Sequence, residues 1–215
     1  MVVFTDTFDG AAGQLIGSRT GWTSSPGYWD IWKLDGAGAA QVSGADLGDG
    51  KAVLHDTGVD SHYAQVVVGN GFVISEGTLA FIACASQRYD GLAVRYAGGN
   101  LELRPGIDNS LIASYAVALA AGDVIRVAFK NDTKRAEVFL NGVRVIDADV
   151  SAEPLLTFGS TLTGFTSKYS GVTPTADVFR SFEAGEYADT ADGTPPVLTG
   201  SITVGAKTSS TIDIS

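Results

Sequence analysis

Short runs of alternating apolar and polar residues, separated by turn residues, are the feature of this chain that most restricts its fold. The segments AGGN, KNDT and LNGV hold the Gly, Asn and Asp that chain reversals need. No segment keeps apolar residues at i, i+3, i+4 and i+7 over three helical turns. Because connections this short join antiparallel neighbours, the pattern predicts an all-β protein with two packed antiparallel sheets.

Residues 91–105 form the clearest hairpin of the sequence. Five apolar residues at alternate positions predict its buried face: Leu92, Val94, Tyr96, Leu101 and Leu103. Three charged residues then share the opposite face: Arg95, Glu102 and Arg104. In the interpretation that we prefer, these three make cross-strand ion pairs. In the alternative, Arg95 and Arg104 line a ligand-binding face of the sheet.

Composition excludes several classes of protein. A net charge of −10 argues against nucleic acid, whose binding needs clustered Lys and Arg. No run of 18 apolar residues predicts a membrane span. The one cysteine, Cys84, lies in the apolar run LAFIACA, which favours a buried structural thiol over a reactive one. The start MVVFTDTF lacks the features of a secretory signal, so we expect synthesis and folding in a reducing cytosol.

The composition changes near residues 185–196, where GEYADTADGTPP is acidic and rich in small residues. This segment predicts a domain boundary. We therefore expect a β-sandwich over residues 1–188, a linker over 189–196 and a short β segment over 197–215. In this last segment, Ile202 and Val204, then Ile212 and Ile214, alternate with polar residues as in two short strands.

Three stretches together resemble a known family. The first, FTDTFDGAAGQLIGSRTGW at 4–22, carries the matching residues Asp6, Phe8, Asp9, Gly13, Leu15, Gly17 and Trp22. The others are YWDIWKLDGAGAAQV at 28–42 and AEVFLNGVRVIDA at 136–148. They resemble concanavalin A-like (laminin-G-like) jelly-roll domains of phage tail and virion proteins and of bacterial surface proteins. The resemblance covers roughly residues 2–185, and residues 197–215 resemble the first strands of a fibronectin type III domain.

The resemblance implies a non-enzymatic component of a phage virion, from a tail fibre, a tail tip or a capsid-surface appendage. Its expected location is the virion, and its expected partners are other virion proteins, copies of itself and host-surface glycans. The alternative is a carbohydrate-binding module of a bacterial surface protein or of a secreted glycan-active enzyme. That alternative predicts an extracellular or cell-surface location.

Aromatic residues that could stack on sugar rings gather in GWTSSPGYWDIW. Along a strand, Trp29 and Ile31 share one face, whereas Tyr28 and Trp32 share the other. Both pairs cannot point into one core, so Tyr28 and Trp32 are the candidates for an exposed glycan platform. Their burial under a loop or a neighbouring subunit is the interpretation that we prefer, since domains of the resembled family commonly bury a Trp at this place.

A calcium site is the one cofactor that the resemblance implies, since relatives connect their first and last strands through oxygen ligands. If those strands are adjacent here, Asp6 and Asp9 would meet Asp177 or Glu183. Turn capping by Asp9 before Gly10 explains that residue without a metal. The cluster His55, Asp56, Asp60 and His62 matches no transition-metal spacing, and we interpret it as a polar loop.

Catalytic residues are not evident. Jelly-roll glycanases place their carboxylates on one strand as Glu-x-Asp-x-x-Glu, and this pattern is absent. Asp147 and Asp149 are the nearest pairing, but they close a strand and lack a third carboxylate. No Gly-x-Ser-x-Gly motif occurs either. The sequence therefore predicts a protein that is not an enzyme.

Overall fold

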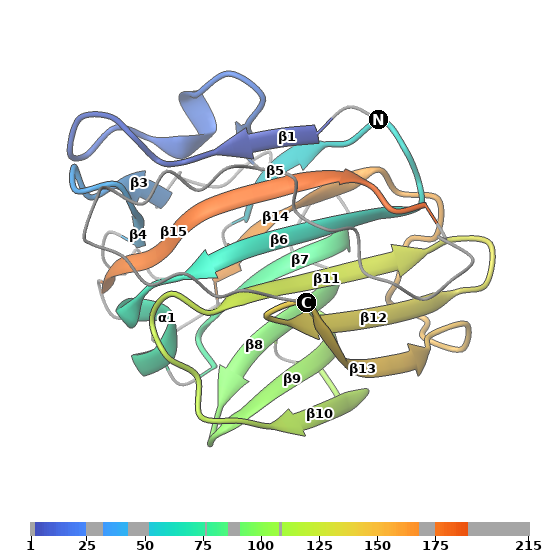
Figure 1. Ribbon diagram of the computed structural model, residues 1–215. Coiled ribbons are helices and arrows are strands. Elements are labelled where there is room, and N and C mark those ends of the chain that lie inside the picture. The colour runs from blue at the N-terminus through green and yellow to red at the C-terminus, as the bar shows by residue number, and fades with distance from the viewer. Residues whose placement is uncertain are drawn as a thin grey trace, which may run out of the picture.

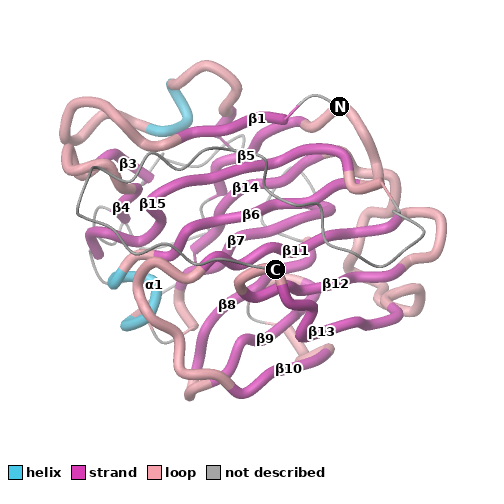
Figure 2. The backbone as a smooth tube through the Cα atoms, in the orientation of Figure 1, coloured by secondary structure: helices cyan, strands magenta, loops and turns pink. Residues whose placement is uncertain are grey.

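Two antiparallel β-sheets make up the part of the chain that the computed structural model describes, residues 3–24, 32–42, 52–75, 77–85, 91–107, 109–167 and 175–188. The sheets form two layers (Figure 1). Strands predominate over helices along the described chain (Figure 2). The predicted all-β, two-sheet jelly-roll sandwich is confirmed. The predicted linker and fibronectin-like segment lie outside the described residues.

Sheet A has eight strands and contains the first and last described strands. Its order is β13 (Val143–Asp149), β12 (Arg135–Leu140), β11 (Val124–Lys130), β6 (His62–Val68), β15 (Thr175–Glu186), β4 (Ala40–Val42) and β3 (Trp32–Leu34). The eighth strand, β1 (Val3–Asp6), pairs with the second half of β15. The first and last described strands are therefore adjacent, which was the condition set for the predicted calcium site.

Sheet B has seven strands. Its order is β10 (Ala113–Ala116), β9 (Asn100–Pro105), β8 (Leu92–Ala97), β7 (Leu79–Ala85), β14 (Leu162–Ser167), β5 (Ala52–Asp56) and β2 (Thr23–Ser24). The sequence did not predict a strand at the position of β14. It lies between β7 and β5, in the interior of the sheet.

The described residues contain two short helical segments, the 3₁₀ turn η1 (Ile16–Ser18) and the helix α1 (Asn70–Ile74). Neither was predicted, since one turn is too short to show a helical period. The helix α1 carries Phe72 into the core, where its ring centroid lies 5.2 Å from that of Phe179. No helix in the described ranges has the length and apolar character needed to cross a membrane.

The core lies between the two sheets, and the alternation in the sequence determines which side chains enter it. On β11, Ile125, Val127 and Phe129 belong to the main core cluster, whereas Arg126 lies on the outer face of sheet A. The β8–β9 hairpin likewise buries the five predicted apolar residues. The prediction for this hairpin is confirmed because side chains of a strand alternate between the faces of its sheet.

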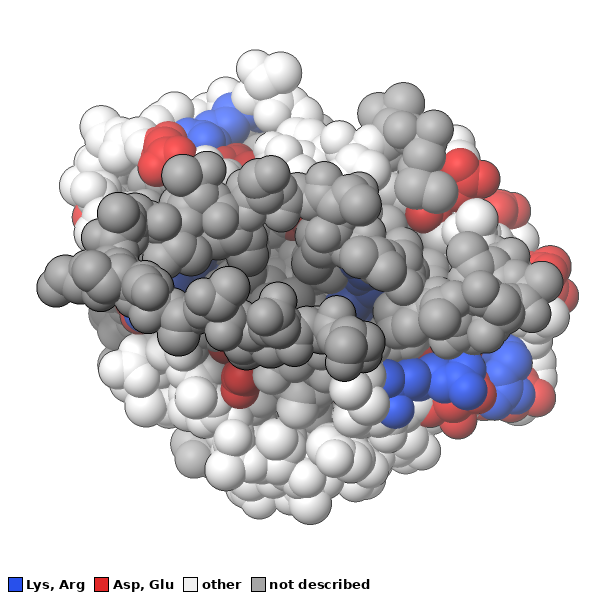
Figure 3. Space-filling model, viewed as in Figure 1, with Lys and Arg blue, Asp and Glu red and all other residues white. Residues whose placement is uncertain are grey.

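Charged residues cover part of the outer face of sheet A. Figure 3 shows basic and acidic atoms side by side over β12 and β13. Here Arg135 pairs with Asp147 at 2.5 Å, and Arg144 pairs with the buried Glu137 at 2.6 Å. Because opposite charges alternate, this surface presents no field of a single sign.

A β-bulge in β7 fixes the position of Cys84. The register between β14 and β7 shifts near this point, and Cys84 has φ +51°, an unusual value for a residue other than glycine. Its amide N–H turns toward β6 and donates to Nε2 of His62 at 2.9 Å. The bulge thereby connects the two sheets through a single hydrogen bond.

Cys84 is expected to resist thiol reagents in the folded protein. Its side chain is buried, its Sγ lies 3.4 Å from the Thr157 carbonyl, and burial raises the pKa of the thiol to about 12. An aromatic disulfide reagent at pH 8 should therefore react at least about a hundredfold faster in guanidinium chloride than in native buffer. Rapid labelling of the native protein would show that the thiol is accessible.

Candidate functional site

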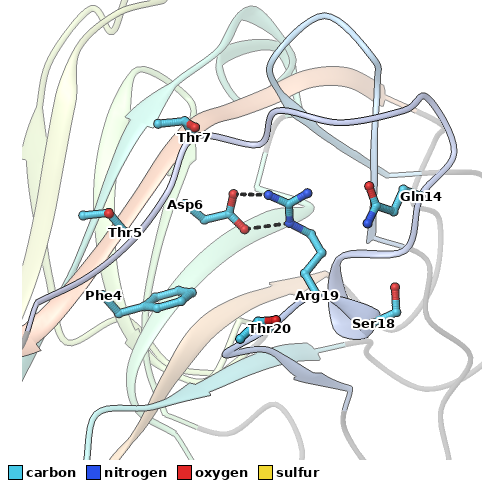
Figure 4. Close-up of a pocket in the computed structure, with 8 residues that line it drawn as sticks. All are labelled: Phe4, Thr5, Asp6, Thr7, Gln14, Ser18, Arg19 and Thr20. Atoms are coloured by element: carbon cyan, nitrogen blue, oxygen red, sulfur yellow. Dashed lines mark hydrogen bonds and ion pairs between the residues drawn. The ribbon is translucent and has the colours of Figure 1, made fainter.

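An open cleft of about 490 Å³ lies beside β1 and is the candidate site. Figure 4 shows its two walls, one from β1 and the residue after it, the other from the loop that contains η1. The lining residues are Phe4, Thr5, Asp6, Thr7, Gln14, Ser18, Arg19 and Thr20. Its volume lies in the range of about 300–1,000 Å³ that is usual for small-molecule sites. Most of these side chains are polar.

An ion pair between Asp6 and Arg19 connects the two walls (Figure 4). Nε of Arg19 donates to Oδ2 of Asp6 at 2.9 Å, and Nη2 donates to Oδ1 at 2.7 Å. The indole N–H of Trp22 donates to Oδ2 at 2.8 Å, from a ring that is part of the core. Both oxygens of Asp6 are thus occupied, and the guanidinium is held in one orientation.

The chain after β1 reverses at a strained residue. Phe8 is fully buried and has φ +58°, a left-handed conformation that is rare for an aromatic residue. Its amide N–H donates to Oδ1 of Asp6 at 2.8 Å, which closes an Asx turn. Strain of this kind persists only where neighbouring contacts impose it. Asp6 therefore both shapes the turn and orients Arg19.

The absence of a side chain at Gly10 leaves space for both Gln14 and Arg19. A Cβ at Gly10 would lie 2.7 Å from Oε1 of Gln14 and 3.3 Å from Nη1 of Arg19. That Nη1 donates to the Asp9 carbonyl at 2.9 Å. The two side chains accordingly lie on the same small area of the cleft wall, close to the backbone.

Phe4 is the aromatic residue of the lining, and it is half-buried. Its ring stacks on His55, with centroids 3.9 Å apart and planes 13° apart. Gly21 allows this position, since a Cβ there would lie 2.5 Å from Cε2 of Phe4. Burial lowers the pKa of His55, although the hydrogen bond to the Gly21 carbonyl and the charge of Asp56 oppose this effect. Phe4 thus has a rigid, uncharged support.

Three polar side chains of the cleft remain available. Thr5, Gln14 and Thr20 have no side-chain partner among the residues that the structure describes. By contrast, Thr7 donates to the Asp9 carboxylate at 2.6 Å, and the Ser18 hydroxyl donates to the Leu15 carbonyl at 2.7 Å. The available groups are two hydroxyls and one amide, and each can both donate and accept.

The sequence analysis did not predict this cleft, although it drew attention to Asp6 and Trp22. Arg19 was overlooked because it lies in a loop without a periodic pattern, whereas its partner Asp6 lies on the strand β1. One signal was present: Arg19 stands within the family-like stretch 4–22, between two of its matching residues, Gly17 and Trp22. A buried carboxylate requires a cation, and Arg19 is the basic residue of that stretch.

The predicted aromatic platform requires a correction. Trp32 is fully buried, and its ring lies 5.3 Å from that of Phe165 and 5.8 Å from that of Phe179. It therefore belongs to the core, as the preferred interpretation held, and presents no face to a sugar. Tyr28 lies outside the described residues.

Arg95 and Arg104 form the ion pairs that the preferred interpretation predicted. Both donate to Oε2 of Glu102, at 2.7 Å and 2.9 Å. Burial alone would raise the pKa of Glu102, but the two guanidinium groups outweigh burial and lower it. Arg95 also donates to the carbonyl of Ile107 at 2.9 Å. These contacts hold the arginines against the outer face of sheet B, and a ligand role for them remains a prediction.

The four carboxylates of the predicted calcium site are not brought together, which corrects that prediction. Asp6 points toward Arg19 and the core, whereas Glu183 lies on the outer face and accepts a hydrogen bond from Tyr63 at 2.7 Å. Asp177 pairs with Arg180 at 2.8 Å, and this contact lowers its pKa. Asp9 binds the Thr7 hydroxyl next to its own turn. No group of three metal-ligating side chains occurs among the described residues.

The two histidines also lie apart. The strands β5 and β6 belong to different sheets, so no hairpin joins His55 to His62. His55 binds the Gly21 carbonyl through Nδ1, and His62 binds the Val59 carbonyl through Nδ1 and the Cys84 amide through Nε2. Each makes a structural contact, but both lie on strands, β5 and β6, and not in the predicted polar loop.

A pair of facing carboxylates does occur on sheet A, where Glu137 and Asp147 are opposite each other on β12 and β13. Nη1 of Arg144 lies 2.6 Å from the first and 3.5 Å from the second, so a guanidinium fills the space between them. Glycosidases need that space for the scissile bond. Asp149 accepts the Ser151 amide at 2.9 Å, as a turn cap does.

No protein-family model matches the chain, and no curated protein matches it in sequence. Solved structures do resemble it. An endo-acting O-glycanase of the human gut microbiota has a TM-score of 0.54 at 10% identity, over 86% of this chain and 99% of the other. The metal-free exoplasmic/lumenal domain of VIP36 has a TM-score of 0.54 at 8% identity, over 86% of this chain and 92% of the other. Arcelin-5, a lectin-like defence protein of Phaseolus vulgaris, has a TM-score of 0.50 at 12% identity, over 85% of this chain and 96% of the other.

This chain has the concanavalin A-like fold. At 8–12% identity the similarity establishes the arrangement of the strands and nothing about shared chemistry. Function must therefore be argued from the cleft itself.

Proposed function

We propose that this domain binds glycans without cutting them, through the cleft beside β1. The observation that carries the proposal is the combination in one cleft of an oriented guanidinium, available hydroxyl and amide groups, and a half-buried ring. Sugars are bound in this way, with hydroxyls fixed by polar groups and C–H faces laid on an aromatic ring. The cleft is open, so a chain can enter it from the side.

The comparisons support glycan binding in general terms. One similar structure is the VIP36 domain in a form bound to Ca²⁺ and mannose, with a TM-score of 0.51 at 9% identity, over 86% of this chain and 89% of that one. Calcium, if this domain uses it, would need ligands other than the predicted four carboxylates. Two features oppose cleavage: Asp6 is saturated by four donors, and Arg144 separates Glu137 from Asp147.

A carbohydrate-binding module of a surface or secreted protein is the setting that these observations favour. An extracellular or cell-surface location belongs to the same proposal. The virion setting, with other virion proteins and copies of the chain as partners, stays a prediction from the sequence resemblance. A glycan ligand is common to both settings.

Binding to a glycan array, followed by calorimetry on the best ligand, tests the proposal. Gln14→Ala and Thr20→Val should each weaken binding roughly three- to tenfold, because each removes one hydrogen bond. Both side chains are exposed, so stability should change by less than about 0.5 kcal/mol. Ser114→Ala, an exposed hydroxyl on β10, is the control that should bind normally. The proposal fails if no glycan binds, or if the two cleft variants bind as tightly as the control.

A further inference from the structure

The charges at the cleft limit which glycans it can accept. Arg19 is the cation of the lining, and Asp6 already neutralises it through two hydrogen bonds. A second carboxylate, Asp9, lies next to the cleft, since Arg19 donates to its carbonyl and Thr7 donates to its Oδ2. Within the described chain Asp9 has no cation partner. Asp9 therefore adds a negative charge beside a guanidinium that Asp6 already neutralises.

The strand β15, which pairs with β1, adds no free positive charge. Thr5 is opposite Glu183 in the β1–β15 register, and Glu183 lies 3.7 Å from Arg126, so these two charges offset each other. The whole chain carries a net charge of −10. A carboxylate or sulfate entering the cleft would meet Asp9 at short range and a negative protein at long range.

The hydrogen-bonding groups lead to the same conclusion. The available side chains of Thr5, Gln14 and Thr20 can each donate and accept, which suits sugar hydroxyls, since these also do both. A carboxylate or sulfate only accepts, so it would leave the acceptor oxygens of the cleft unused. Arg19 uses three N–H groups in the contacts described, and its remaining N–H groups can serve a hydroxyl oxygen.

We propose that the cleft selects neutral glycans, whose units carry hydroxyls and neither carboxylate nor sulfate. This rests on the proposed function and adds the class of ligand. Asp9 is then the residue that excludes acidic glycans, although it makes no contact that a neutral ligand needs. Asp6 and Arg19 present a neutral pair to the ligand.

The test compares three neutral polysaccharides, a β-glucan, a mannan and a fructan, with polygalacturonate, hyaluronan and heparin at low salt. At least one neutral chain should bind, and each acidic chain should bind at least about tenfold more weakly than it. Asp9→Asn keeps an oxygen for the Thr7 hydroxyl and removes the charge. This variant should reduce the difference in affinity between neutral and acidic polysaccharides several-fold and leave the affinity for neutral polysaccharides unchanged. High salt should also reduce this difference in affinity, because it screens the charges.

The outcomes separate this inference from the proposed function. An acidic glycan that binds more tightly than every neutral one, and that loses affinity in Gln14→Ala and Thr20→Val, would overturn neutral selection and leave glycan binding intact. A preference for neutral chains that Asp9→Asn leaves unaltered would also overturn it, because another group would then exclude the anions. Absence of binding to all six chains would remove both proposals.

Discussion

Lowering the pH from 7 to 4 is expected to reduce the free energy of unfolding by roughly 3 kcal/mol through one side chain, His62. The imidazole is fully buried between the sheets. Its Nδ1–H donates to the Val59 carbonyl at 3.1 Å, and its Nε2 accepts the Cys84 amide at 2.9 Å. Burial therefore lowers the pKa of His62 from 6.5 to about 4.

The direction of the effect follows from proton binding. Between pH 6.5 and 4 the unfolded chain protonates this histidine and the folded chain does not, so acid favours unfolding. Below pH 4 both states are protonated and the loss levels off. Protonation would also place a donor on Nε2, opposite the Cys84 N–H. The carboxylates of Asp56 and Asp60 face the ring and favour its charged form, but burial outweighs them.

His62→Gln is the variant that isolates this contribution, because glutamine can accept one hydrogen bond and donate another but does not titrate. We expect this variant to lower the free energy of unfolding by about 1–2 kcal/mol at pH 7, because glutamine replaces the two hydrogen bonds of the imidazole imperfectly. Its free energy of unfolding should then fall by roughly 3 kcal/mol less than that of the wild type between pH 7 and 4. Urea unfolding at four or five pH values measures both curves, and parallel curves would contradict the assignment.

The sequence predicted those parts of the fold in which burial is decided locally. In the β8–β9 hairpin each side chain alternates with its neighbours, so the apolar set alone determines the buried face. The same alternation holds on β11, where Arg126 lies outside and Val127 lies in the core. Because the predicted strand had aromatic residues on both of its faces, the same reasoning did not decide the burial of Trp32. Its burial depends on Phe165 and Phe179, which come from strands far along the chain.

The candidate site was only partly predictable for a related reason. Asp6 was selected as an oxygen ligand for a metal, since a carboxylate on a first strand fits that purpose. The structure instead provides Arg19 and the indole of Trp22 as its partners, through a loop whose path has no periodic signal. Sequence spacing alone does not bring residue 6 next to residue 19. The polar character of the region was visible, but its partners were not.

The missed strand β14 has a different cause. Its sequence, LTGFTS, contains a glycine, two threonines and a serine, a composition that is typical of turns as much as of strands. Gly164 is nevertheless required where it stands. A Cβ there would lie 1.9 Å from the Val53 carbonyl oxygen on the adjacent β5. The residue that hid the strand from sequence analysis is the one that allows the strand to pack.

Gly164→Ala is accordingly expected to destabilise the protein strongly. Relief of a contact at 1.9 Å to backbone requires movement of β5 or β14, and β14 lies in the interior of sheet B. We expect a loss of about 4 kcal/mol or more, which corresponds to a fall in Tm of about 8–16 °C. Val53 and Phe165, which are directly paired, would lose core contacts as the strands separate.

Gly159→Ala is the matched control, because Gly159 precedes the same strand and has φ +84° with nothing within 4 Å of an added Cβ. It should cost only about 1–2 kcal/mol, the strain of a left-handed alanine. Thermal unfolding of the two variants therefore separates steric overlap from backbone conformation. Equal losses would mean that β5 yields to the added methyl group. A much larger loss at Gly164 would show that the close approach of β5 and β14 holds the centre of sheet B in place.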